Sequence, residues 1–229
     1  MKLNHMDFPC TILWKENEIP TLVIENSKLF AEFVLDFCRQ TEGKEGKWIL
    51  SESAELLKLS QACSVIVNPF ALSVNQKKLL NALYEQINKE TTSTELLFEW
   101  NQLYPVMVNT LDKIVGNMEY HLTYNTELEI KDFLKLMNLR FEESAENLLE
   151  SLIDYITLTH EVLKTRLFVL VNIKSYLDET ELSYLFEQIF YKKISILLIE
   201  NHMSEQNFSY ENVTIIDKDC CIISQTMSQ

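Results

Sequence analysis

The chain has 229 residues, of which 47% are hydrophobic, with only 3 glycines and 4 prolines. This composition excludes a disordered or low-complexity chain and indicates a helix-rich globule, either one domain with a large insertion or two modest domains. The formal net charge of −14 at pH 7 argues against a protein that coats nucleic acid indiscriminately, because such proteins carry a basic surplus.

The N-terminal part of the sequence alternates between strand and helix patterns. The predicted elements are strands over 10–14 and 21–25, a helix over 28–40, a strand over 48–52, a helix over 52–61 and a strand over 63–68. The first two strands flank a polar turn and predict a β-hairpin, and Ser27 is placed to cap the first helix.

A helical period then continues almost without interruption from residue 71 to residue 164. We interpret 71–164 as an inserted helical domain, and 1–70 with 165–229 as the α/β domain that receives it. The remaining predicted elements are a strand over 166–172, a helix over 178–193, and strands over 194–200, 212–217 and 220–224.

Three apolar runs, 65–67, 167–171 and 194–199, lack the polar alternation of a half-exposed strand. They predict strands in the centre of a sheet that helices cover on both faces. Ligands of such sheets usually bind beyond the carboxyl ends of the strands. Here those ends carry Asn68, Asn172 and Glu200.

The strand–helix–strand pattern over 165–200 is typical of nucleotide-binding proteins, but the chain has no glycine-rich phosphate loop. Gly43 and Gly46 lie in EGKEGKW, where Trp48 stands in place of the required Ser or Thr, and Gly116 is isolated. The sequence therefore predicts a nucleotide-binding scaffold without its chemistry, and no nucleotide cofactor.

No other catalytic pattern emerges. His160 and Glu161 begin like a metalloprotease helix, but Lys164 occupies the position where a second histidine would be needed. Asp217 and Asp219 are better explained by a turn than by a metal site. We therefore predict a protein that is not an enzyme.

The segment 118–132 interrupts the helical domain with threonines, tyrosines and an asparagine. In an extended chain, Glu119, His121, Thr123, Asn125 and Glu127 would project from one face. Oxygen-rich alternation can bind calcium, although this face offers only two carboxylates near its ends. A solvated connector is the alternative, and the residues alone favour it.

Basic side chains concentrate in the helical insertion. Lys131 and Lys135 are four residues apart and share a helix face, and Arg140 follows shortly after. In a monomer this is an ordinary solvated face. Repeated by symmetry around a hole, the same residues could form a basic lining within an acidic shell.

The sequence also bears on localisation. The apolar run near the N-terminus is too short for a signal peptide, and no stretch approaches membrane-spanning length. The 5 cysteines follow no C-x-x-C spacing. These features predict a cytoplasmic protein with buried, reduced thiols and no membrane contact.

The order of the elements, with several local patterns, resembles the Csn2 family, the small accessory adaptation proteins of type II-A CRISPR systems. The patterns are KLFAEFVLDFCRQ, LSVNQKKLLNALYEQINKE after a central strand, KDFLKLMNLRFE, RLFVLVN and ILLIE. The resemblance implies a degenerate P-loop-like α/β head with an inserted α-helical leg.

The resemblance also implies a homotetrameric ring that binds double-stranded DNA ends without sequence specificity or nuclease activity, in spacer acquisition. The CRISPR integrase complex and the type II effector nuclease would be its partners. Lys135 and Arg140 match basic positions of the family and, with Lys131, are the expected DNA contacts. Calcium in that family lies near the segment matching 119–129, where this chain keeps Glu119 and Glu127.

Two alternatives to the DNA-binding ring remain open. One is an acidic protein-interaction scaffold that makes no direct contact with DNA. The other is an enzyme with an unrecognised site.

Overall fold

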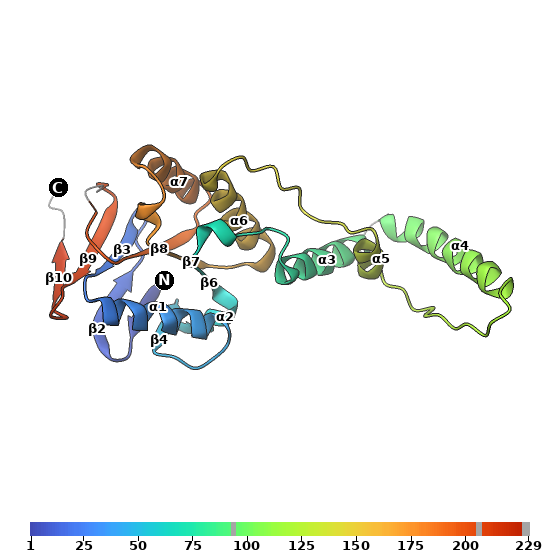
Figure 1. Cartoon of the computed structure of the whole chain (residues 1–229), viewed down its shortest axis with the longest axis horizontal. Coiled ribbons are helices and arrows are strands. Elements are labelled where there is room, and N and C mark those ends of the chain that lie inside the picture. The colour runs from blue at the N-terminus through green and yellow to red at the C-terminus, as the bar shows by residue number, and fades with distance from the viewer. Residues whose placement is uncertain (93–94, 205–207, 226–229) are drawn as a thin grey trace. The chain divides into compact units, whose positions relative to one another are not determined.

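The computed structural model describes residues 1–92, 95–204 and 208–225 and divides into two compact units (Figure 1). We call the first unit the head, which comprises Met1–Ser73 with Ser144–Gln229. We call the second the leg, which comprises Val74–Glu143.

The head is built on a six-stranded sheet in the order β10-β9-β3-β8-β7-β6. Its strands are β3 (Ile19–Ile24), β6 (Cys63–Ile66), β7 (Leu167–Val171), β8 (Ser195–Glu200), β9 (Glu211–Ile216) and β10 (Ile222–Gln225). All neighbouring pairs are parallel except β9 with β10. Parallel pairing of this kind requires crossover connections and cover on both faces.

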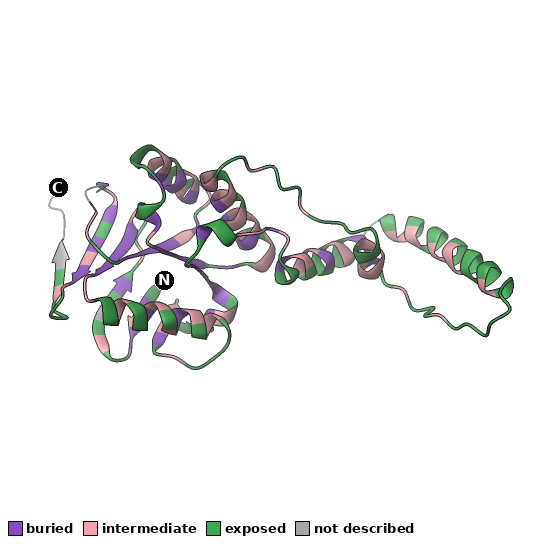
Figure 2. Ribbon diagram, in the orientation of Figure 1, coloured by how far each residue is buried: buried purple, intermediate pink, exposed green. Residues whose placement is uncertain are grey.

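Helices supply that cover. On one face lie α1 (Ser27–Thr41) and α2 (Leu59–Ala62), and on the other α6 (Leu148–Leu163) and α7 (Glu179–Tyr191). Every residue of β3 and β7 is buried as a result, so the apolar runs of the sequence form the purple centre of the head in Figure 2. The α/β class predicted from the sequence is confirmed.

A second sheet, in the order β2-β1-β4-β5, packs on the α1 face. Its strands are β1 (Lys2–His5), β2 (Phe8–Leu13), β4 (Trp48–Glu52) and β5 (Glu55–Leu57). The predicted hairpin of 10–14 with 21–25 is therefore wrong, because β2 pairs with β1 while β3 pairs with β8 and β9. The alternating burial of β2 and the complete burial of β3 suit two different sheets.

Two further predictions need correction. Residues 52–61 form β5 and the short α2 instead of one helix, because Ser53 and Ala54 adopt positive φ angles of 48° and 67° and reverse the chain after β4. The predicted central strand at 65–67 overlaps the end of β6, which lies at an edge of the large sheet, and Val67 beyond it is exposed. Within β6, Cys63 and Ile66 join the cores on opposite faces.

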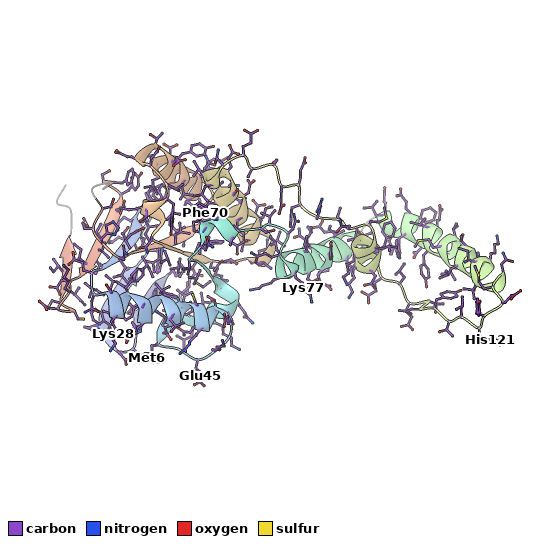
Figure 3. The ribbon with its side chains drawn as sticks, in the orientation of Figure 1. Met6, Lys28, Glu45, Phe70, Lys77 and His121 are labelled. Carbon is purple, nitrogen blue, oxygen red and sulfur yellow. The ribbon has the colours of Figure 1, made fainter. Side chains whose placement is uncertain are left out.

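The leg consists of α3 (Lys77–Thr92), α4 (Leu96–Gly116) and α5 (Ile130–Leu136), and α3 contacts both other helices. The Asn75 side chain bonds to the backbone N–H and C=O of Phe141, at 2.9 and 3.1 Å, and so ties the two ends of the unit together. The connection from 117 to 129, which contains His121 (Figure 3), has no helix or strand.

The leg is shorter than the insertion predicted at 71–164. Helix α6 lies within that predicted range, yet it belongs to the head because Leu152 and Ile156 are buried against the large sheet. In the part of the chain that the structure describes, no helix is both long and apolar enough to span a membrane.

Candidate nucleic-acid interface

The connection from β3 to α1 is the place where a phosphate loop would follow the first parallel strand. Here it is two residues, Glu25 and Asn26. The Asn26 side chain accepts hydrogen bonds from the backbone N–H groups of Lys28 and Leu29, at 3.2 and 3.0 Å. The amides of the first turn are therefore already bound by the helix's own cap, which lies one residue before the predicted Ser27.

The glycines serve local geometry. Gly43 adopts a φ of 86° in the turn after α1. A Cβ at Gly46 would lie 2.4 Å from a carboxylate oxygen of Asp36 and from Cγ of Gln40, so a larger residue would displace these side chains. Gly116 is the last residue of α4, and a Cβ added there would have no atom within 4 Å.

The polar residues predicted at the carboxyl ends of the strands are bound to protein groups. Asn68 accepts the N–H of Phe70 at 3.1 Å. Asn172 has a φ of 53° and accepts the N–H of Asn201 at 3.0 Å. Glu200 is buried and accepts the N–H of Lys174 at 3.3 Å.

Sequence reasoning missed a buried ion pair near Glu200. The Lys174 Nζ lies 2.8 Å from both carboxylate oxygens of Glu211, and the Thr21 hydroxyl donates to the same carboxylate at 2.9 Å. The Lys174 and Glu211 side chains are only 4% and 1% exposed. No local sequence pattern signals this arrangement, because Lys174, Glu211 and the donor Thr21 come from three separate segments.

The three predicted DNA contacts lie in the leg and differ in their surroundings. Lys131 Nζ is 2.7 Å from Glu129 and 3.4 Å from Glu85, and its hydrogen bonds to these carboxylates raise its pKa. Lys135 is paired with Asp132 at 3.1 Å.

Arg140 stands apart from the two lysines. It is exposed, and it forms no ion pair with any residue that the structure describes. The same is true of Lys77, at the start of α3, and Lys113, near the end of α4. These three cations keep their charge uncompensated, so they are available to phosphate groups without loss of an internal pair.

The predicted calcium residues Glu119 and Glu127 are exposed in the 117–129 connection. Asn125 accepts the N–H of Glu127 at 2.9 Å, and this local turn interrupts the extended alternation that the site would need. Among the described residues, no group of three His, Cys, Asp or Glu side chains is arranged to hold a metal ion. Glu119 and Glu127 are thus two carboxylates outside any larger ligand group in the described part of the chain, and calcium binding by them stays a prediction.

Two smaller predictions have clear outcomes. Asp217 accepts the N–H groups of Asp219 and Cys221, at 3.0 and 2.8 Å, which confirms a turn. The prediction of buried thiols holds for Cys63, whose pKa is raised by burial, but is wrong for the exposed Cys220 and Cys221.

Comparison with known proteins adds a family. The family model described as CRISPR-associated protein (Cas_Csn2) matches residues 40–220. A protein from Enterococcus faecalis named CRISPR-associated protein Csn2 is 20% identical over 193 residues, which cover 82% of this chain and 85% of that protein. A nucleotide-free ATP-binding cassette from an ABC transporter is 12% identical, with coverage of 91% and 80% and a TM-score of 0.45. At that TM-score the cassette supports no inference about this chain.

We expect calcium to bind weakly, with a dissociation constant on the order of 10⁻⁴ M or higher, because ligand charge largely sets affinity and the segment offers two carboxylates. Titration calorimetry on chelator-stripped protein measures this. Joint substitution Glu119→Gln and Glu127→Gln should remove the heat, while Glu99→Gln with Glu142→Gln should retain it. Tight binding that persists in the first double variant would contradict the assignment.

Proposed function

We propose, given that the chain belongs to the Csn2 family of CRISPR-associated proteins, that it binds ends of double-stranded DNA during spacer acquisition. In this proposal four copies form a ring and the DNA passes through it. The family match over residues 40–220 carries the proposal. The CRISPR integrase complex and the type II effector nuclease are its proposed partners.

We also propose that the head is a degenerate P-loop-like scaffold that neither holds a nucleotide nor catalyses a reaction. The parallel sheet and the strand-to-helix step from β3 to α1 support a nucleotide-binding ancestry. The side chain of Asn26 supports the loss of phosphate binding, because it occupies the amides that a phosphate would use.

The exposed surface of α4 supports self-assembly. This helix has 21 residues, none of them buried. Six of its large apolar side chains are between 37% and 69% exposed: Leu96, Phe98, Leu103, Val106, Leu111 and Ile114. Monomers rarely leave many large apolar side chains uncovered on one helix, because covering apolar surface releases about 25 cal/mol per Å². A second copy of the leg is the proposed cover.

The distribution of charge supports DNA as the ligand of the ring. Arg140, Lys77 and Lys113 carry uncompensated charge in every copy of the leg. Multiplied by symmetry, such contacts would supply the sequence-independent phosphate affinity that DNA threading needs. The net charge of −14 would then discourage binding of DNA to the outside.

One observation favours the scaffold as the alternative. Lys131 and Lys135 are already paired with Glu129, Glu85 and Asp132. Each must give up a carboxylate before it can neutralise a phosphate. A leg whose other cations also failed to bind DNA would be a surface for protein partners instead.

Assembly through α4 predicts that Val106→Asp lowers the mass of the particle in solution. The charge would have to be buried at each copy of the contact, at a cost of several kcal/mol. Light scattering after gel filtration reports the mass, and Asn101→Asp on the same helix is the matched exposed control. An unchanged mass in Val106→Asp would place the contact elsewhere.

Threading predicts that the protein binds a linear duplex but not a covalently closed circle of the same sequence, because a preformed ring admits DNA only at an end. Affinity for the linear form should fall with salt, with a logarithmic slope of about −0.9 for each phosphate neutralised. Filter binding across a salt series measures both. Equal affinity for circles would exclude threading, and complete absence of binding would favour the scaffold.

The ion pairs of the leg predict which substitution weakens DNA binding more. Arg140→Ala should weaken binding of all duplex sequences equally and flatten the salt slope by about 1 for each phosphate that is no longer neutralised. Lys131→Ala should have the smaller effect, because Glu129 and Glu85 already hold its ammonium. Lys28→Ala in the head is the control. A larger loss of affinity for Lys131→Ala than for Arg140→Ala would show that the internal pairs open on binding.

A further inference from the structure

The sheet face under α6 and α7 carries more negative than positive charge in a buried cluster. Lys174 supplies one ammonium, whereas Glu200 and Glu211 supply two carboxylates. Glu200 is 2% exposed, so water does not stabilise a second negative charge there. An unbalanced buried charge is costly, and the usual resolution is that one group takes up a proton.

The two carboxylates differ in their hydrogen bonds. Glu211 receives both contacts of the Lys174 ammonium and the hydroxyl of Thr21. Glu200 receives the backbone N–H of Lys174 and lies near the negative charge of Glu211. Burial raises the pKa of Glu200 to about 7, and the hydrogen bond from Lys174 offsets only part of that effect. The charged groups that act on it are Lys174 and Glu211.

We propose that Thr21, Lys174, Glu200 and Glu211 form a proton-linked lock that joins η2 (Ile173–Ser175) to β3, β8 and β9. The lock is closed when Glu200 carries a proton. When Glu200 loses that proton, it competes with Glu211 for the single ammonium, and the extra charge draws water into the site. The contacts of η2 with the sheet loosen in that state.

The lock connects to the surface at the carboxyl edge of the sheet. Tyr176 directly follows η2, and its ring meets Phe70 edge-on with centroids 5.3 Å apart. Both side chains are exposed, and Figure 3 labels Phe70. On the other side of the lock, Asn172 binds the N–H of Asn201, the residue after Glu200. A change in the charge of Glu200 therefore acts on η2 through the Lys174 backbone, and η2 is followed directly by Tyr176 of the exposed aromatic pair.

The direction of the pH dependence follows from the raised pKa. Glu200 ionises near 4.5 in the unfolded chain and at about 7 in the folded one. Its contribution to stability is fully present below pH 4.5 and is lost as the pH rises through 7. Between pH 6 and 8 this residue alone should raise the unfolding equilibrium constant by roughly tenfold.

Denaturant unfolding of the full chain at pH 6, 7 and 8, compared with Glu200→Gln, tests the lock. Glutamine keeps the shape of protonated Glu200 without the titration, so the roughly tenfold change should disappear from the variant and remain in Glu16→Gln, an exposed control. The difference between the two proteins cancels the titration of every other group. Equal pH dependence in wild type and Glu200→Gln would overturn the proposal.

Hydrogen exchange supplies a second measurement, which stays decisive if the glutamine variant folds poorly. After correction for intrinsic rates, the amides of 173–176 should exchange faster at pH 8 than at pH 6 in the wild-type protein. Glu211→Gln should abolish that difference, because the carboxylate that competes with Glu200 for the ammonium of Lys174 is then gone and Glu200 stays ionised at both pH values. Unchanged protection would overturn the lock. Neither measurement uses DNA, so its result is independent of the proposed function.

Discussion

The burial of β3 and β7 over their whole length, and of β8 from Ile196 to Glu200, is the constraint on which the rest of the head depends. A strand with apolar side chains on both faces must be covered twice, and the chain provides α1 with the small sheet on one side and α6 with α7 on the other. Charged groups are then tolerated only at strand ends or as balanced sets. Glu200 and Glu211 occupy such ends, and Lys174 reaches between them. The buried charge cluster is thus a consequence of the same layering that builds the core.

The sequence predicted what local physics controls. Continuous apolar runs located β7 and β8, and the helical pattern over 178–193 located α7. Prediction from the sequence failed where strand pairing or helix packing depended on residues far away in the chain. Nothing local says that 10–13 pairs with β1 or that the helix at 148–163 packs on the head, because periodicity identifies an apolar face without identifying what covers it.

The candidate site residues show the same contrast between what local sequence sets and what distant partners set. The positions of Asn68, Asn172 and Glu200 at strand ends followed from the pattern, but their partners did not. Thr21, Lys174 and Glu211 meet only in the fold, since they are separated by more than thirty residues at the closest. In the leg, the pairing of Lys135 with Asp132 follows from i,i+3 spacing, whereas the contact of Lys131 with Glu85 needs α3 and α5 side by side.

The head and the leg differ in how much apolar surface they bury. The head buries large side chains on both faces of its sheet, whereas α4 in the leg buries none completely and leaves six large apolar side chains exposed. A helix of this kind gains little from its own chain, because most helical stability comes from packing of the apolar face. Assembly would therefore complete the leg as a folded structure and, in the same step, multiply Arg140, Lys77 and Lys113 around a common axis. In this proposal the exposed apolar side chains of α4 explain both properties. They would bring a second copy of the leg into contact, and that contact would place the cations of several copies together.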